Sequence, residues 1–156
     1  MTFLWNASGP IENDPWTDAD GDRPILSLEA ALQSNAETIG VQIEPADDVR
    51  RLEPILDRVA LVAVNFPAFN DGRAFSHATL LRQRLGYRGE IRGVGAVLLD
   101  QVPLMLRVGI DSVAVTHEPT IRRLKEQRLP GIALHYQPSV IPTTDGEGYS
   151  WRRRAV

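Results

Sequence analysis

The chain of 156 residues contains no cysteine. That absence excludes disulfides, thiolate nucleophiles, iron–sulfur clusters and cysteine zinc sites. The chain also lacks any apolar run approaching the roughly 20 residues that a membrane-spanning helix needs. Its first residues, Met1–Asn6, lack the basic region and long apolar core of a signal peptide. We therefore expect a cytoplasmic protein, and the length fits one domain.

Lysine is almost missing too, so nearly all the positive charge is carried by arginine. The charge is unevenly spread: residues 1–70 hold 12 acidic and 4 basic side chains, and residues 71–156 hold 8 acidic and 13 basic ones. The planar guanidinium suits oxyanions, so the second half predicts an anionic ligand or an acidic partner. The alternative is an ordinary solvated surface. Nucleic acid is not expected, because the net charge is −3 and the basic residues are not interleaved with aromatic ones.

Strand-like and helix-like segments alternate along the chain with short links. We expect strands at 39–43, 61–65, 90–95, 111–115 and 132–136, and helices at 25–33, 47–58, 77–85, 100–108 and 119–128. This order predicts one α/β domain over 1–138 with a mostly parallel sheet, either open or closed in part like a TIM barrel. Residues 1–24 are expected to form an irregular N-terminal arm, and 139–156 a flexible tail.

The segment Phe66-Pro-Ala-Phe-Asn-Asp-Gly-Arg-Ala-Phe-Ser-His77 joins a buried strand to a helix. In parallel α/β proteins this junction lies at the carboxyl edge of the sheet, where ligands bind. The segment supplies a cation in Arg73, a carboxylate that can orient it in Asp71, and a flexible Gly72. It also places the hydroxyl of Ser76 near a helix start, where backbone N–H groups favour anions. It therefore predicts an anion-binding loop.

Three expected strands end at Asn65, Gly95 and Thr116, so the loops that follow them should meet at one edge. This brings eight chemically useful residues into one neighbourhood: Asp71, Arg73, Ser76, His77, Asp100, Gln101, His117 and Glu118. The predicted ligand-binding set is Asp71, Gly72, Arg73 and Ser76, with Arg82, Arg92 and Gln101 as secondary members. The candidates for acid–base catalysis are Asp71, Asp100 and His117, and whether the protein is an enzyme stays open. Each has an ordinary alternative, since Asp-Gly is a common turn pair and Ser76 and Asp100 suit helix caps.

The residues favour no cofactor and no metal ion. The run Arg92-Gly-Val-Gly-Ala-Val-Leu98 supplies two of the three glycines of a dinucleotide fingerprint, and no acidic residue ends the next strand to hold a ribose. The chain has no phosphate-binding P-loop and no Gly-x-Ser-x-Gly nucleophile turn. Histidine and carboxylate residues do not recur at the spacing of metal ligands.

Four segments together resemble the bacterial domain of unknown function 934 family, over roughly residues 14–138. They are Phe66-Pro-Ala-Phe-Asn-Asp-Gly-Arg-Ala-Phe-Ser-His-Ala78, Leu80-Leu-Arg-Gln-Arg-Leu-Gly-Tyr-Arg-Gly-Glu-Ile-Arg92, Val94-Gly-Ala-Val-Leu-Leu-Asp-Gln101 and Arg107-Val-Gly-Ile-Asp111, and Tyr136-Gln137 also fits. The chain departs from the family pattern at three positions. Ala96 stands where the family usually has Asp, Ala74 where a second Gly is common, and Val108 where Cys is frequent.

The resemblance implies a role in sulfur metabolism, because genes of this family tend to lie beside those of sulfite reductase. Members carry the label of an oxidoreductase in sulfite reduction, but such chemistry needs a redox cofactor that side chains cannot replace. We therefore expect an accessory protein of sulfate assimilation whose carboxyl edge binds an oxyanion, a phosphorylated metabolite or an acidic surface of sulfite reductase. Two alternatives are a small enzyme acting on an anionic metabolite, and a homodimer packed through Phe66, Phe69 and Phe75.

Overall fold

The computed structural model describes residues 2–16 and 23–126. Its sheet has seven strands in the order β2-β1-β7-β6-β5-β4-β3. The strands are β1 (Phe3–Asn6), β2 (Gly9–Pro10), β3 (Ile25–Ser27), β4 (Ile39–Ile43), β5 (Val59–Phe66), β6 (Glu90–Gly95) and β7 (Ser112–Val115). The helices are α1 (Leu28–Gln33), α2 (Arg73–Gln83), α3 (Val102–Arg107) and α4 (Glu118–Lys125), with 3₁₀ helices η1 (Val49–Arg58) and η2 (Leu99–Gln101).

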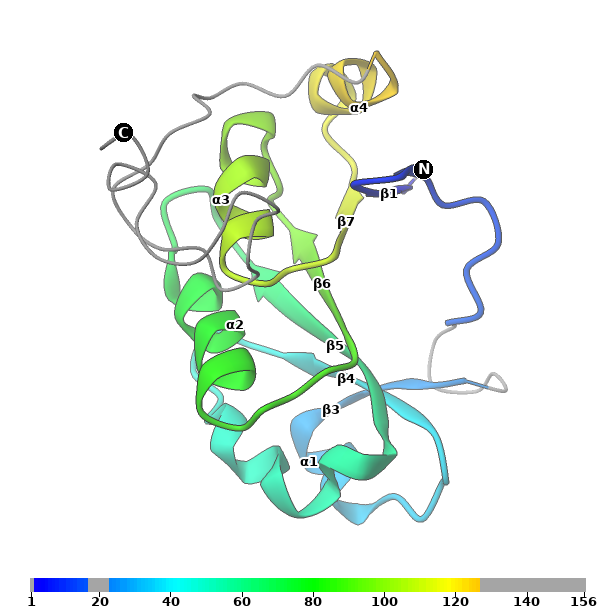
Figure 1. The fold of residues 1–156 in the computed structure, drawn as a ribbon, viewed down its shortest axis with the longest axis vertical. Coiled ribbons are helices and arrows are strands. Elements are labelled where there is room, and N and C mark those ends of the chain that lie inside the picture. The colour runs from blue at the N-terminus through cyan, green and yellow to red at the C-terminus, as the bar shows by residue number, and fades with distance from the viewer. Residues whose placement is uncertain (1, 17–22, 127–156) are drawn as a thin grey trace, which may run out of the picture.

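Strands β3 to β7 are parallel and lie side by side in chain order, which confirms the α/β class with a mostly parallel, open sheet. Because successive right-handed crossovers all step in the same direction, they place the helices on one face of the sheet, as Figure 1 shows. On that face Val62 and Val64 of β5 pack in one apolar cluster with residues of the helices. This continuous apolar sequence is typical of a strand in a parallel sheet.

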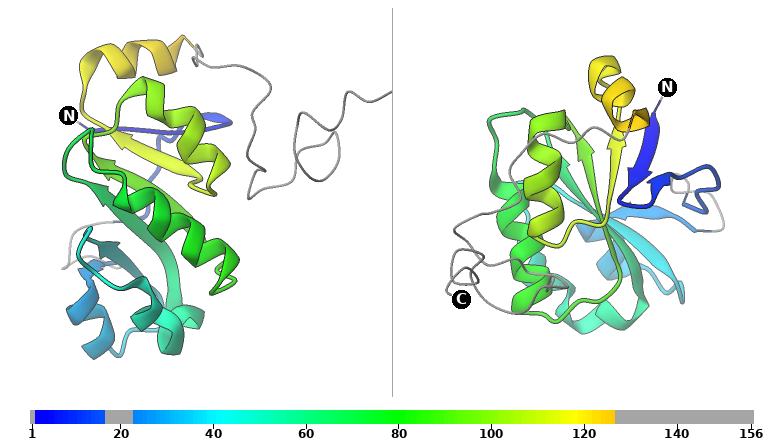
Figure 2. Two further views of the ribbon diagram at one scale, coloured as in Figure 1. Left: turned by 90° about the vertical axis from the view of Figure 1, so that its left-hand side faces the viewer. Right: turned by 45° about the horizontal axis from the view of Figure 1, so that its top comes forward.

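The other face of the sheet is crossed by the N-terminal residues (Figure 2). Trp16 is buried against Gly40 of β4, where a Cβ would stand 3.2 Å from the indole ring. Asp14 forms an ion pair with Arg92 of β6. These two contacts hold residues 11–16 against the face of the sheet that the helices do not cover.

The N-terminal arm and the first helix differ from the prediction. The arm is not wholly irregular, because β1 pairs antiparallel with β7 and β2 pairs with β1. This pairing joins residues more than a hundred positions apart, so no local periodicity reveals it. Ile25–Ser27 is a strand rather than the first turn of a helix, since it pairs with β4. Ser27 does cap α1, as expected, accepting from the N–H of Ala30 at 3.3 Å.

The expected helix at 47–58 is the 3₁₀ helix η1, with Pro54 inside it. Pro54 has no N–H to donate, which disfavours a regular α-helix across it. Helix α2 begins at Arg73, four residues before the expected start. No helix in the described part of the chain is long and apolar enough to span a bilayer. The expected strand at 132–136 and the tail at 139–156 lie outside the described residues.

Candidate functional site

The carboxyl edge of the sheet presents Arg73 in a fixed orientation. Arg73 donates from Nε to Oδ1 of Asp71 at 3.0 Å and from Nη2 to Oδ2 at 2.7 Å, and its backbone N–H bonds to Oδ1 at 3.2 Å. The side chain of Asp71 is 16 % exposed and that of Arg73 is 61 % exposed. The hydrogen bond to Arg73 lowers the pKa of Asp71, and the same bond raises the pKa of Arg73. Asp71 therefore stays ionised, and Arg73 offers solvent a permanent cation.

The loop before Arg73 exposes an aromatic ring. Phe69 is 65 % exposed, and among the described residues it is the one large hydrophobic side chain that is exposed. Gln101, the last residue of η2, donates from Nε2 to the backbone oxygen of Phe69 at 2.6 Å. Phe66 is fully buried and packs edge-on against the half-buried Phe75, with ring centroids 5.0 Å apart. Of the three phenylalanines considered for a dimer, Phe69 is the one that faces solvent.

Ser76 and His77 lie inside α2 rather than at its cap, which is Gly72 and makes no side-chain hydrogen bond. Ser76 is exposed one turn along from Arg73. Nδ1 of His77 is buried and has no hydrogen-bond partner among the described residues. Burial lowers the pKa of His77, against the opposing effect of the nearby carboxylate of Asp47. The imidazole is therefore held in its neutral form near neutral pH.

The remaining acid–base candidates do not join Asp71 and Arg73. His117 is the residue before α4, and its Nδ1 lies 2.8 Å from Oγ1 of Thr120. That hydroxyl also accepts from the N–H of Leu99 at 3.2 Å. His117 therefore contacts the threonine that links α4 to η2. Asp100 and Glu118 are exposed. The structure describes no hydrogen bond or ion pair from these residues to Asp71 or Arg73.

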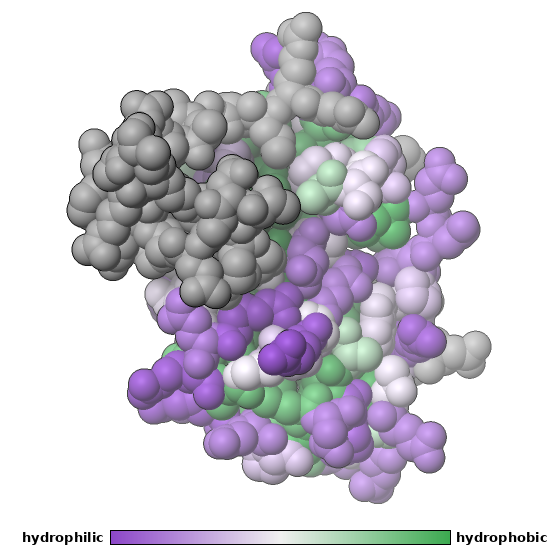
Figure 3. All heavy atoms as spheres, in the orientation of Figure 1, coloured by the Kyte–Doolittle hydropathy of each residue, from purple (hydrophilic) through white to green (hydrophobic). Residues whose placement is uncertain are grey.

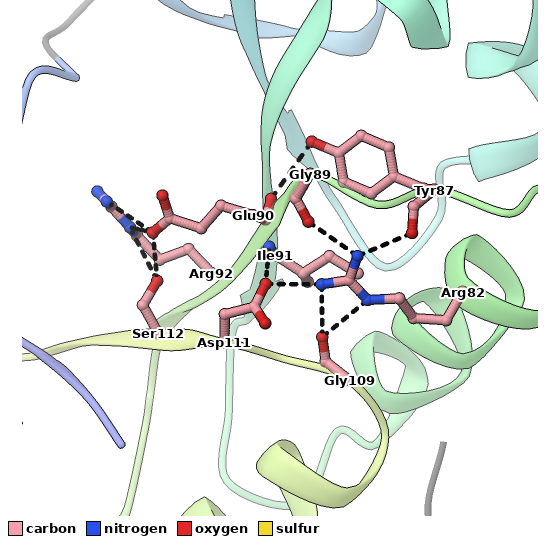
Figure 4. Close-up of polar contacts among 9 residues, drawn as sticks. All are labelled: Arg82, Tyr87, Gly89, Glu90, Ile91, Arg92, Gly109, Asp111 and Ser112. Carbon is pink, nitrogen blue, oxygen red and sulfur yellow. Dashed lines mark hydrogen bonds and ion pairs between the residues drawn. The ribbon is translucent and has the colours of Figure 1, made fainter. Parts of the chain in front are cut away.

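Arg82 lies at the opposite, amino edge of the sheet (Figure 4). It donates to the carbonyl oxygens of Tyr87 and Gly89 at 2.8 Å each, and to that of Gly109 at 3.0 and 2.9 Å. It also bonds Oδ2 of Asp111 at 2.6 Å. A guanidinium has five N–H donors, so none is left for a ligand. Arg82 does not belong with Arg73 but ties the end of α2 to the starts of β6 and β7.

Arg92 lies on the face of the sheet opposite the helices, and its side chain is 5 % exposed. It makes a bidentate pair with Asp14 at 2.8 and 2.9 Å and also bonds Glu90, whose Oε1 accepts from the hydroxyl of Ser112 at 2.6 Å. Although burial opposes its charge, the hydrogen bonds that Arg92 donates to Asp14, together with the nearby negative charge of Glu90, raise the pKa of Arg92. Arg92 therefore attaches the N-terminal arm to the sheet. It does not lie with the predicted ligand-binding residues Asp71, Arg73 and Ser76.

Two features of the carboxyl edge were missed in the sequence. Arg50 donates two side-chain hydrogen bonds to the carboxylate of Asp48, both at 2.9 Å, in the arrangement that Arg73 makes with Asp71. The repeated Asp-x-Arg spacing after an apolar strand is the signal that could have revealed it. In addition, Glu44 accepts from the amide of Asn65 at 2.6 Å and from that of Gln42 at 2.7 Å. Gln42 and Glu44 lie two residues apart at the end of one strand, and Asn65 lies at the end of the adjacent strand. This spacing of polar residues is the signal that could have revealed their contacts.

Gly95 ends β6 beside these side chains with a φ of 88°, and a Cβ there would collide with Asn65 and the backbone of Phe66. Glycine is therefore required at this end of the strand. Ala96 follows it and donates its N–H to the carbonyl of Phe66 at 2.6 Å. The side chain at this position is a methyl group, so Ala96 supplies no carboxylate to the loop.

Two cavities are described, and neither is lined by Asp71, Arg73 or Gln101. One, of about 370 Å³, lies at the amino edge beside Asp14 and Arg92. The other, of about 470 Å³, lies between α2 and α3 and includes Ser76. Figure 3 shows that hydrophilic residues cover much of the visible described surface, with hydrophobic ones in patches between them. The surface formed by Phe69, Asp71 and Arg73, called the Arg73 surface below, thus lies outside these two cavities.

Comparisons with known proteins agree with the resemblance in the sequence. The model of a bacterial protein family of unknown function, DUF934, matches residues 40–145. Searches of the curated proteins and of the solved structures gave no significant match. The matched region contains all but the first residue of β4, the whole of β5 to β7, and the loop before Arg73. With two thirds of its length in that match, the chain belongs to the DUF934 family.

Proposed function

We propose that this protein is an accessory protein of sulfate assimilation, linked to sulfite reduction, and that its carboxyl edge docks an acidic surface of a partner. The observation that carries the proposal is that an exposed ring, Phe69, and an oriented and exposed cation, Arg73, lie four residues apart at this edge. Aromatic residues and arginine are the side chains most enriched at the energetic centres of protein interfaces.

The loop is built to present both groups in a fixed position. Gln101 holds the backbone of Phe69, and Asp71 holds the guanidinium of Arg73. Preorganised groups lose less conformational entropy on binding than mobile ones do. Nη1 of Arg73 keeps its N–H donors free of the Asp71 fork and is available to a carboxylate of the partner.

A partner surface is favoured over a small substrate by the arrangement of the catalytic candidates. The bond to Arg73 keeps Asp71 ionised and a weak base, while His117 is engaged with Thr120. Neither residue lines either described cavity. The choice of sulfite reductase as the partner rests on the resemblance to a family whose genes lie beside those of that enzyme.

Purified sulfite reductase from the same organism should bind the immobilised protein, and the complex should weaken with added salt because the contact is charged. Arg73→Ala should abolish binding. Arg50→Ala is the matched control, since it removes the same kind of exposed Asp-x-Arg fork one crossover away, and it should bind like the wild type. Equal binding by both variants, or no binding by the wild type, contradicts the proposal. Binding of inorganic sulfate or phosphate without the reductase would replace the partner by a small anion.

A further inference from the structure

Helix α2 carries apolar side chains on two faces. Ala74, Ala78 and Leu81 are buried against the sheet. Phe75 and Leu80 lie on other sides of the helix and are half-buried. A helix on the surface of a domain ordinarily has one apolar stripe and an opposite polar face. The second set therefore forms an apolar surface that the core of this domain does not use fully.

This surface is hollowed into a groove of about 470 Å³ between α2 and α3. Phe75, Thr79 and Leu80 line it from α2, and Leu104 and Val108 line it from α3. Such a groove between two helices is the form of site that receives an amphipathic helix from another protein. Ser76 also lines the groove and stands one turn from Arg73, so the groove continues from the Arg73 surface.

Positive charge marks both ends of the groove. Arg73, Leu80 and Arg84 are spaced i, i+7 and i+11, which places them along one side of α2. Eleven residues of α-helix span about 16 Å. Arg73 and Arg84 are both exposed, and among the described residues the guanidinium of Arg84 has no hydrogen bond or ion pair, although its backbone N–H bonds to Leu80. The residues that line the groove include Arg84 and no acidic side chain.

From this arrangement we propose that the groove between α2 and α3 binds an acidic amphipathic helix of the partner. Its apolar side chains enter the groove beside Leu80, and its carboxylates, about three turns apart, meet Arg73 and Arg84. The inference rests on the proposed function, because it names the segment of the partner that the same surface holds.

Charge and burial argue against the other two occupants. The sequence after residue 126 contains four arginines and two acidic residues, so it has the same sign of charge as the ends of the groove. A second copy would have to offer a helix from its acidic residues 1–70. The described helices of that region, α1 and η1, bury apolar side chains in their own core, so these are not available to the groove of another copy.

The test uses the full chain and two synthetic helical peptides of about 14 residues, or four turns. Both carry leucines along one stripe, one has glutamates at both ends, and the other has lysines there. Fluorescence anisotropy should show that the glutamate peptide binds at least about tenfold more tightly than the lysine peptide. Equal affinities, or no binding of either peptide, overturn the proposal; no binding is also the result if another part of the chain occupies the groove.

Two variants and one control distinguish binding in the groove from non-specific binding. Thr79→Arg places a long side chain in the groove and should abolish binding, while its circular dichroism spectrum should match the wild type. Arg84→Glu should reverse the preference, weakening the glutamate peptide and strengthening the lysine peptide. Arg123→Glu, the same change on the exposed side of α4, should leave both affinities unchanged. Unreversed preference in Arg84→Glu contradicts the proposed charge contacts.

The two proposals can fail separately. If neither peptide binds but sulfite reductase is captured in an Arg73-dependent way, the groove is wrong and the docking function stands. If the glutamate peptide binds but the reductase does not, the groove stands and the partner must be another acidic protein.

Discussion

The two edges of the sheet use arginine in opposite ways. At the amino edge, the side chain of Arg82 is 12 % exposed, and its donors are consumed by carbonyl oxygens and one carboxylate. At the carboxyl edge, Arg73 is 61 % exposed and is held by a single carboxylate. A guanidinium without free donors can only stabilise the fold, whereas an oriented one with free donors can recognise another molecule. Burial and donor use therefore separate arginines that can only stabilise the fold from those free to bind. Among the free ones, Arg73 differs from Arg50 in following an exposed aromatic residue, Phe69, closely in the chain.

The largest expected effect is on Arg92, the most buried arginine of the amino half of the sheet. Arg92→Met leaves the carboxylates of Asp14 and Glu90 facing one another without a cation. Breaking a buried ion pair in this way costs about 3–5 kcal/mol, and urea unfolding should show a loss of that size. Adding Asp14→Asn should recover part of the loss, because it removes one unpaired charge. A single variant as stable as the wild type would contradict the structural role.

A smaller loss is expected for Arg82. Arg82→Met deprives the carbonyl groups of Tyr87, Gly89 and Gly109 of a donor. Leaving buried polar groups unsatisfied costs about 1–3 kcal/mol, which urea unfolding can measure. Arg84→Ala is the control on the same helix, and as a surface substitution it should stay within about 0.5 kcal/mol of the wild type. If the two variants lose equal stability, the distinction between the buried and exposed arginines of α2 is wrong.

Arg73→Ala should leave the urea midpoint unchanged, although it abolishes capture of the partner. The guanidinium of Arg73 is 61 % exposed, so water can replace it beside Asp71, and ion pairs open to solvent in this way add little to the stability of a fold. Arg50→Ala should also leave the urea midpoint unchanged, but this variant should still capture the partner. A marked loss of stability in Arg73→Ala without a binding defect would assign this arginine to the fold.

The smallest effect concerns pH and His77. Because burial holds the folded pKa of His77 below its ordinary value of 6.5, the unfolded chain binds the proton more readily. The stability associated with the neutral imidazole is therefore complete above pH 6.5 and declines as the pH falls through the folded pKa. His77→Gln should flatten the decline of unfolding free energy between about pH 7 and 5, the window set by the histidine reference pKa. An unchanged slope would show that His77 titrates freely.

The sequence predicts the fold well where the signals are local. Apolar runs such as 61–65 identify the parallel strands, and their order fixes the edge at which the loops meet. It misses β1, because that strand exists through its pairing with β7 far along the chain. The start of α2 is also missed, since Gly72 caps it without a side-chain bond that would mark the position.

The candidate site is predicted in part for the same reason. Asp71 and Arg73 lie two residues apart, so their pairing can be anticipated from the local sequence. Arg82 finds its carboxylate in Asp111, 29 positions away, and this contact depends on the whole crossover between β6 and β7. The sequence shows that arginines are many but not which of them have their donors filled.

We propose that partner binding depends on Arg73 at the carboxyl edge, and that Arg82 at the amino edge serves the stability of the fold. One experiment measures both properties in wild type, Arg73→Ala and Arg82→Met: the urea midpoint of each protein, and its affinity for purified sulfite reductase on a sensor surface under native conditions. We predict that Arg73→Ala loses affinity at an unchanged midpoint, and that Arg82→Met loses stability while its folded fraction binds like the wild type. The opposite assignment, with Arg73→Ala unstable but binding and Arg82→Met stable but not binding, would contradict the account.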